Sequence, residues 1–177
     1  VIGDLSGDQF ETQISSAEWL DILLGGKETE TSERRPDEHR NAEPSAQELS
    51  LSDVRDSLLR LTPTAFEHLT SELFRHLGYP NVKVTGRTAD GGVDVIAQKS
   101  ARQGQERVVV QCKRYERSVG VGVARDLRGV MAADSSISGG YIVTSGTFTR
   151  QCERFCEAES IRMISGIQLA NYIRRFN

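Results

Sequence analysis

Three consecutive valines at residues 108–110 are the feature that most restricts how this chain can fold. Valine favours extended backbone, and an apolar run without polar alternation indicates a strand that is buried inside a sheet. The run continues without a break into Gln111, Cys112 and Lys113. The chain therefore places an amide and a cation at the end of a core strand. At 177 residues, it is long enough for one ordinary domain with a core and some additional chain.

Helical and extended patterns alternate along the chain after residue 50. Apolar residues at helical spacing predict helices, and short apolar runs between turn residues predict strands. This order of elements, αβββαβαβα after a first short helix, predicts an α/β fold with a mixed central sheet flanked by helices. The predicted helices cover residues 51–63, 63–78, 121–134, 149–160 and 167–176, and the predicted strands cover residues 81–88, 91–99, 106–115, 139–146 and 161–165.

The first fifty residues differ from the rest in charge and composition. They hold 4 Lys and Arg against 12 Asp and Glu, a net charge of −8, whereas residues 51–177 hold 18 against 13, a net charge of +5. Residues 27–48 contain two prolines and no aliphatic side chain larger than alanine, which is typical of a linker. We therefore divide the chain into an acidic leader, residues 1–50, with one short helix at residues 17–24, and a folded domain, residues 51–177. The basic excess of that domain suits a partner made of phosphates.

The sequence also narrows the compartment in which the protein works. No apolar run approaches the roughly 20 residues of a membrane span, and the chain opens without a secretory signal pattern. Three cysteines without a disulfide framework favour a reducing compartment, so we expect a cytoplasmic protein. The first residue is Val1, which leaves room for further domains or subunits outside this chain.

The polar residues after the valines are expected to lie close to a carboxylate. Residues two apart on a strand face the same side, so Gln111 and Lys113 share one face while Cys112 points to the other, toward the core. The turn before this strand is predicted to centre near Gly104. Counting ten residues back and nine forward then places Asp94 across the hairpin from Lys113. An amide, a lysine and a carboxylate are therefore expected at one end of the sheet.

Two other observations bear on this end of the sheet. Gly91 and Gly92 precede Asp94, and without side chains they would leave the end open to a bulky ligand. The alternative to a functional site is an ordinary salt bridge between Asp94 and Lys113 at the edge of the sheet.

Four stretches of the domain resemble one nuclease family. Residues 66–79 (FEHLTSELFRHLGY), 90–97 (DGGVDVIA), 108–115 (VVVQCKRY) and 139–149 (GGYIVTSGTFT) follow the order seen in the Mrr-like branch of the PD-(D/E)xK restriction endonuclease superfamily. The resemblance covers about residues 61–173. It implies a mixed sheet flanked by helices, cleavage of DNA phosphodiester bonds, and the use of Mg²⁺, with Mn²⁺ as a possible substitute.

The resemblance also implies a role for individual residues. Asp94 matches the family aspartate that binds metal, and Lys113 matches the catalytic lysine. Gln111 takes the place of the second acid, and Glu67, in the first long helix, matches an additional acid found in many members. The implied catalytic residues are thus Asp94, Gln111, Lys113 and Glu67, and the implied metal ligands are Asp94, Gln111 and Glu67. The neutral amide of Gln111 leaves the metal one formal charge short, although a carbonyl oxygen still suits a hard cation.

Several residues after the lysine are candidates for contact with DNA. Arginines there suit phosphate groups, with solvated surface arginines as an equally good alternative. Hydroxyl and amide groups between a strand and a helix also suit phosphate, although simple capping of the helix by Thr147 or Thr149 explains the same segment. The candidates are Arg114, Arg117, Arg125, Arg128, Thr144 and Ser145.

Together these features predict a magnesium-dependent DNA endonuclease that acts in prokaryotic restriction of foreign or modified DNA. Double-stranded DNA is the expected partner, and a homodimer would supply the two active sites that cutting both strands usually needs. Two alternatives remain open. One is a DNA-binding module of the same fold that has lost cleavage, with Gln111 as the trace of that loss. The other is a partner-docking domain of a larger defence protein.

Deleting residues 1–50 should leave a domain that still unfolds in one cooperative transition. The reason is that the leader has a net charge of −8 and no apolar pattern beyond its one short helix, so it adds little to a hydrophobic core. Thermal unfolding of the shortened chain, followed by circular dichroism, tests this. Loss of the cooperative transition would place the domain boundary earlier in the chain.

Overall fold

The computed structural model describes residues 51–85, 92–102 and 104–176. The acidic leader, its predicted short helix and Gly91 lie outside the described residues, so the domain boundary at residue 50 stays a prediction. Within the described part of the chain, the search for a helix long and apolar enough to cross a membrane finds none.

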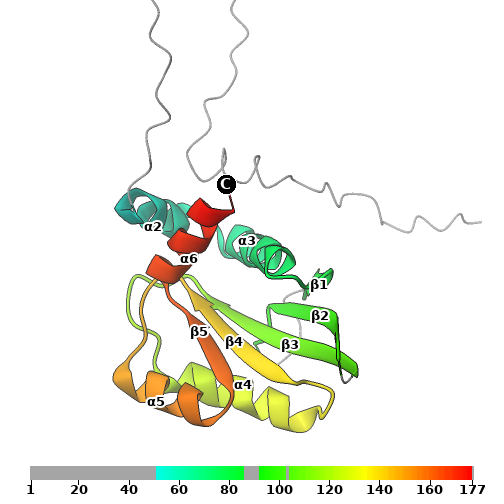
Figure 1. The fold of residues 1–177 in the computed structure, drawn as a ribbon. Helices are drawn as coiled ribbons and strands as arrows, with labels where there is room; N and C mark the ends of the chain where they lie inside the picture. The colour runs from blue at the N-terminus through cyan, green and yellow to red at the C-terminus, as the bar shows by residue number, and fades with distance from the viewer. Residues whose placement is uncertain (1–50, 86–91, 103, 177) are drawn as a thin grey trace, which may run out of the picture.

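A five-stranded mixed sheet forms the centre of the domain, with its strands side by side in sequence order (Figure 1). The first three strands pair antiparallel, and the last three pair parallel, so the third strand belongs to both halves. The strands are β1 (Asn81–Val84), β2 (Val95–Ala101), β3 (Gly104–Lys113), β4 (Gly139–Thr144) and β5 (Ile161–Ile164). The predicted mixed sheet is confirmed.

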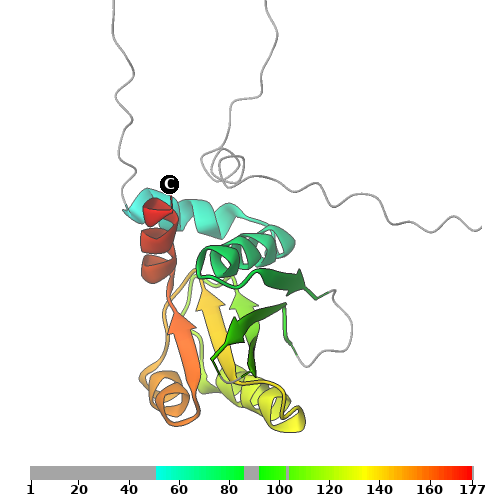
Figure 2. The ribbon, with the colours of Figure 1, turned by 45° about the vertical axis from the view of Figure 1, so that its right-hand side comes forward.

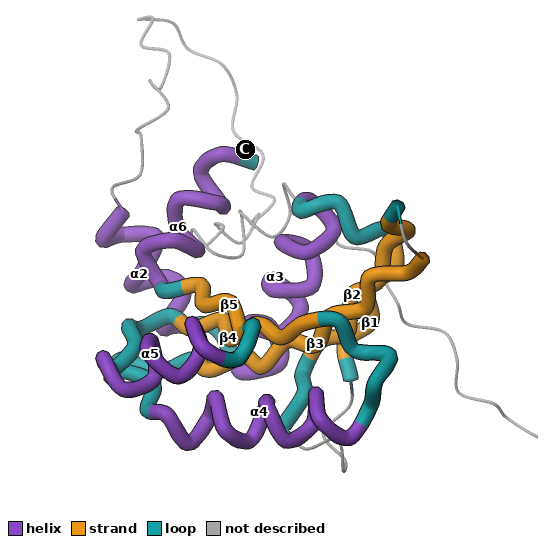
Figure 3. Tube along the Cα trace, turned by 60° about the horizontal axis from the view of Figure 1, so that its bottom comes forward, coloured by secondary structure: helices purple, strands orange, loops and turns teal. Residues whose placement is uncertain are grey.

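Helices cover both faces of this sheet, as the apolar valine run requires. Figure 2 shows helices above and below the sheet, and Figure 3 shows the same three layers with the sheet in the middle. The helices on one face are α2 (Leu51–Arg60), α3 (Pro63–His76) and α6 (Gly166–Arg175), and those on the other are α4 (Val121–Ala133) and α5 (Arg150–Ala158). The predicted order of elements and the α/β class are therefore confirmed.

β3 divides its side chains between two hydrophobic cores. Val108 and Val110 pack into the core under α3 and α6, and Val109 packs into the core over α4 and α5. All three are at most 3% exposed. Full burial of one such side chain contributes about 1.5–3 kcal/mol, so this strand is a main source of the apolar energy of folding.

The hairpin between β2 and β3 differs from the prediction. Ala101 pairs with Gly104, and Val95 pairs with Val110, so the turn lies between Ala101 and Gly104 and is not centred on Gly104. Extending this register places Asp94 opposite Gln111. The predicted partner, Lys113, is therefore wrong by two residues. The physical reason is that the polar residues near the turn still pair through their backbones, so polarity does not end the strands.

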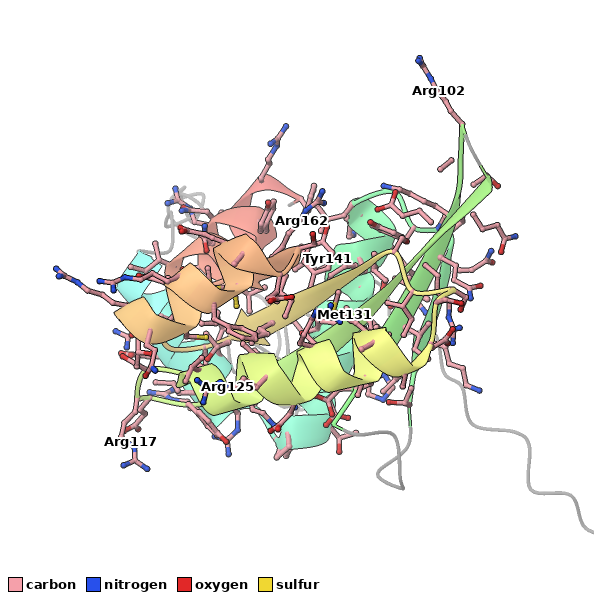
Figure 4. The ribbon with its side chains drawn as sticks, turned by 90° about the horizontal axis from the view of Figure 1, so that it is seen from below. Arg102, Arg117, Arg125, Met131, Tyr141 and Arg162 are labelled. Atoms are coloured by element: carbon pink, nitrogen blue, oxygen red, sulfur yellow. The ribbon has the colours of Figure 1, made fainter. Side chains whose placement is uncertain are left out.

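A polar network closes the other end of the sheet, on the face of α3. The buried hydroxyl of Tyr79 donates a hydrogen bond of 2.7 Å to Glu106, and Lys99 lies 3.2 Å from the same carboxylate and 4.2 Å above the Tyr79 ring. Alongside, Arg162 donates a hydrogen bond of 2.6 Å to the hydroxyl of Tyr141, and Figure 4 shows these two side chains together. The network gives buried tyrosine hydroxyls the partners they need at the end of the core.

Replacing Tyr79 by Phe should raise the pKa of Glu106 and lower the stability of the fold by about 1 kcal/mol at neutral pH. The hydrogen bond from Tyr79 is the main cause that holds the pKa of Glu106 below its ordinary 4.5, ahead of the charge of Lys99. Because the folded-state pKa is depressed, this stability is present above the unfolded-state pKa. It is lost as the pH falls through the folded-state pKa.

The measurements are an NMR titration of Glu106 and urea unfolding of both proteins near pH 7 and near pH 3. Tyr172→Phe is the control, since it removes a tyrosine hydroxyl on α6 that is not among the groups that set the pKa of Glu106. An unchanged Glu106 pKa in Tyr79→Phe would contradict the assignment.

Candidate active site

The candidate site lies at the edge of the sheet where β3, β4 and β5 end. Parallel strands present their carboxyl ends at one edge, and binding sites of α/β folds form there. The helices α4, α5 and α6 each begin after these strand ends. β2 runs antiparallel to β3 and therefore begins at the same edge. Asp94, just before β2, and Lys113, the last residue of β3, are thus brought together at it.

Asp94 is fixed by its main chain and by its carboxylate. Its N–H donates to the carbonyl of Val110 at 2.8 Å, and its own carbonyl accepts from Thr85 at 2.9 Å. Its Oδ2 accepts the backbone N–H of Cys112 at 2.6 Å. Burial raises the pKa of the Asp94 carboxyl, against the opposing effects of the Cys112 N–H and of the charge on Lys113. A desolvated carboxylate of this kind is stabilised by any nearby cation.

Gln111 is buried beside Asp94. Only 4% of the residue is exposed, and its side-chain oxygen Oε1 has no hydrogen-bond partner among the described residues. Leaving a buried acceptor without a partner costs about 1–3 kcal/mol, so such an atom needs an explanation. A bound metal would give this oxygen the partner that it lacks.

Lys113 lies half-buried at the end of β3, two residues beyond Gln111. Its charge lowers the pKa of Asp94. In the described part of the chain, however, Lys113 takes part in no ion pair. The simple edge salt bridge considered from the sequence is therefore not observed, and the ammonium group lies near the carboxylate without being paired to it.

Glu67 lies in α3 and acts by its charge on Cys112, near the end of β3. The evidence is the thiol of Cys112, which packs against the core under α3, as predicted. Burial is the main cause that raises the pKa of this thiol, and the charges of Asp94 and Glu67 raise it further. Both carboxylates therefore act on this thiol by their charge; the predicted role of Glu67 beside Asp94 stays a prediction.

The donor set fits a hard divalent cation. The Asp94 carboxylate and the Gln111 carbonyl oxygen lie on neighbouring strands, and Glu67 offers a further carboxylate. Mg²⁺ prefers oxygen ligands and keeps several of its waters, so few protein ligands are needed. The described residues contain no group of three or more His, Cys, Asp or Glu side chains that would hold a metal unaided. The role of the Gln111 amide oxygen as a further ligand stays a prediction.

Thr144 and Ser145 use their hydroxyls inside the fold. Both are fully buried. The hydroxyl of Thr144 donates to the carbonyl of Lys113 at 2.6 Å, and that of Ser145 donates to the carbonyl of Tyr115 at 3.0 Å. These bonds tie the end of β4 to the end of β3. Contact of either hydroxyl with DNA stays a prediction, and it would require these bonds to break.

Two of the four candidate arginines are engaged with the protein. Arg114 donates from Nη1 to the carbonyl of Leu59, at the end of α2, over 2.7 Å. Arg128 donates from Nε to Glu159 over 2.6 Å and forms an ion pair with it. Their predicted contact with DNA is untested, and in the described chain they join α2 to β3 and α4 to the end of α5.

The other two arginines are exposed. Arg125, in the second turn of α4, lies with its guanidinium 5.9 Å from the ring centre of Phe155. Arg117 projects from the loop before α4, and Figure 4 shows both side chains toward one end of that helix. Of the predicted DNA-binding residues, these two are the best placed to meet a phosphate.

Three features of the site were missed by reasoning from the sequence. The backbone N–H of Cys112 holds Asp94, and a main-chain donor leaves no signal in the sequence. Tyr115, which follows Lys113 by two residues, is 46% exposed although aromatic. The space at Gly92 is not open to a ligand as expected, because the side chain of Gln111 occupies it. In the sequence, the signal for this close contact was Gly92 itself.

Comparison with known proteins supports the resemblance seen in the sequence. The family model described as restriction endonuclease, Mrr_cat, matches residues 58–173. The type IV methyl-directed restriction enzyme EcoKMrr of Escherichia coli (strain K12) is 31% identical over 124 residues, which are 67% of this chain and 40% of that protein. The chain thus spans less than half the length of this relative.

Solved structures show the same fold. The structure of MspJI restriction endonuclease in complex with a 27-mer oligonucleotide matches with a TM-score of 0.51 and 24% identity, over 78% of this chain and 35% of that one. The DNA modification-dependent restriction endonuclease AspBHI matches with a TM-score of 0.55 and 18% identity, over 98% and 46% of the two chains. At these identities the likeness concerns the fold alone. Because the family model covers well over half of its residues, the chain belongs to the restriction endonuclease family, in its Mrr-like branch.

Proposed function

We propose that this domain is a metal-dependent endonuclease that hydrolyses phosphodiester bonds of double-stranded DNA, with Mg²⁺ as its cofactor and Mn²⁺ as a substitute. The observation that carries the proposal is the unpartnered, buried Oε1 of Gln111 beside the desolvated carboxylate of Asp94. Membership of the restriction endonuclease family supports nuclease chemistry in general. The dependence on a metal is proposed from the residues at the site.

Asp94, Gln111 and Glu67 are the proposed metal ligands. The carboxylate of Asp94 is the main anionic ligand, held in place by the Cys112 N–H. Gln111 contributes a neutral carbonyl oxygen from a buried position, and Glu67 adds negative charge directly or through water. A divalent cation bound there would supply Lewis acidity toward a phosphate oxygen and lower the pKa of a bound water.

Lys113 is the proposed catalytic cation. Its ammonium group is not spent on an ion pair with any described residue, so it is available to phosphate oxygens. Negative charge accumulates on those oxygens as water attacks phosphorus, and a fixed positive charge stabilises that state more than the ground state. The lysine is half-buried at the end of β3, on the same strand as Gln111.

DNA is proposed to approach the edge where the parallel strands end. The exposed guanidinium groups of Arg117 and Arg125 lie on the α4 side of that edge. The net charge of +5 on residues 51–177 attracts phosphates and makes the affinity dependent on salt. The exposed ring of Tyr115 adds an apolar surface next to the lysine.

The proposed biological role is restriction of foreign or modified DNA in the cytoplasm of a prokaryote. The Escherichia coli relative is named as a methyl-directed restriction enzyme, which supports modified DNA as the target. Because the chain spans 40% of that relative, selection of the target is assigned to further domains or subunits, and cutting of both strands to a homodimer.

Replacing Asp94 by Asn should reduce plasmid nicking by about 100-fold or more, because loss of the main anionic ligand removes several kcal/mol of metal-based stabilisation. Replacing Lys113 by Ala should reduce nicking by about 100–1,000-fold, the range for one charge-stabilising donor. Affinity for DNA in chelator should be retained in Asp94→Asn, since a negative charge near phosphates has gone. Nicking assays and filter-binding titrations of the same preparations measure both effects.

Matched controls separate these effects from a general change of charge. Asp126→Asn changes an exposed carboxylate on α4, and Lys83→Ala changes an exposed lysine on β1; both should nick like wild type. Equal nicking by wild type and Asp94→Asn would rule out the proposed site. DNA binding without nicking in any protein would favour the binding module, and neither binding nor nicking would favour the docking domain.

Replacing Gln111 by Glu should tighten the binding of Mg²⁺ by about tenfold, because it adds a charge to an oxygen site. It should also lower the melting temperature of the metal-free protein, since a second carboxylate is then buried beside Asp94. Calorimetric titration and thermal unfolding with and without Mg²⁺ measure the two effects. Gln105→Glu, at an exposed position of the same strand, is the control. Unchanged affinity would mean that this side chain does not face the metal.

A further inference from the structure

Gly92 lies in contact with the side-chain amide of Gln111. Its backbone has φ +86°, in the left-handed region that favours glycine. A Cβ at this position would lie 2.5 Å from Nε2 of Gln111 and 3.5 Å from its Cδ. The first distance is far inside the sum of the van der Waals radii. The place that a side chain would take at residue 92 is thus filled by the amide of Gln111.

This contact distinguishes the two ends of the amide. The nitrogen Nε2 rests against Gly92, while the oxygen Oε1 is the buried atom without a hydrogen-bond partner among the described residues. Because Gln111 is only 4% exposed, the surroundings enclose the amide and restrict its rotation. The difference matters for a cation, since a carbonyl oxygen attracts it and an NH₂ group repels it.

We propose that Gly92 is a positioning residue for Gln111. By lacking a side chain, it lets the amide nitrogen rest on the main chain and leaves the carbonyl oxygen directed away from it, available as a ligand for a divalent cation. This inference rests on the proposed metal-dependent function. It assigns the glycine before Asp94 a role in presenting the neutral ligand that stands where the wider superfamily has an acid.

The chain contains a matched control for this role. Gly78 follows α3 with φ +88°, close to the φ of Gly92, and a Cβ there would meet nothing within 4 Å. Alanine at either position therefore imposes the same strain of a left-handed backbone. Only Gly92→Ala adds a collision with Gln111. The pair separates an effect on the amide from an effect on the turn.

The experiment is calorimetric titration of Mn²⁺ into wild type, Gly92→Ala and Gly78→Ala without DNA, together with thermal unfolding of each. Both variants should melt at lower temperature than wild type. The dissociation constant for Mn²⁺ should rise about tenfold or more in Gly92→Ala, the effect of disturbing a supporting contact, and stay within about twofold in Gly78→Ala. Wild-type affinity in Gly92→Ala, or equal weakening in both variants, would overturn the inference.

A second measurement needs no variant and covers the case in which Gly92→Ala fails to fold. In wild-type protein, the side-chain NH₂ protons of Gln111 should show nuclear Overhauser effects to the Hα protons of Gly92. Addition of Mg²⁺ should shift the Gln111 Cδ resonance. Absence of the Overhauser effects would overturn the inference.

The two possible failures are distinguishable. A wild-type protein that binds no Mn²⁺ and shows no metal-dependent nicking overturns the proposed function, and the role of Gly92 with it. A wild-type protein that binds Mn²⁺ and nicks DNA, beside a Gly92→Ala variant with unchanged affinity for Mn²⁺, overturns the role of Gly92 alone.

Discussion

The rest of the domain depends on β3, which pairs with a strand on each side and is covered by helices on both faces. Val110 pairs with Val95 on the antiparallel side and with Tyr141 on the parallel side, and helices cover both faces. From Val108 to Val110 this strand has no free edge and no solvent-facing side. A polar group at the end of this strand must therefore find a hydrogen-bond partner within the site or in a ligand. Gln111 is such a group, because it is buried there.

The same burial explains why an amide is tolerated where the wider superfamily has an acid. Burial already raises the pKa of Asp94, so a second carboxylate next to it would add repulsion to desolvation while no cation is bound. A neutral Gln111 lowers that electrostatic cost and still offers an oxygen. The consequence is a weaker attraction for metal, which makes the orientation of the amide and the carboxylate of Glu67 more important to the site.

The sequence predicted what depends on local pattern and missed what depends on contacts between distant segments. The valine run predicted β3, and the helical spacing from Phe66 to Leu77 predicted α3. The hairpin register was wrong because Ser100 and Gln105 pair through the backbone whatever their side chains prefer. The packing of Gln111 against Gly92, and the burial of the end of β4, depend on contacts between segments far apart in the sequence. No single segment carries that information.

Under the proposed function, the loops after β3 and after β4 determine which side chains remain free to contact DNA. The segment after β3 and the segment after β4 are interlocked: Val119 donates to the carbonyl of Thr147 at 2.8 Å, and Thr149 donates back to Val119 at 3.0 Å. A Cβ at Gly146 would lie 2.6 Å from the carbonyl of Arg117, so the two loops are packed main chain to main chain. At the end of β4, the hydroxyls of Thr144 and Ser145 hold the backbone of Lys113 and Tyr115 in place. Under the proposed function, recognition of phosphate would fall to side chains that project beyond the interlocked loops, and a rigid base under them would lower the entropy lost when DNA binds.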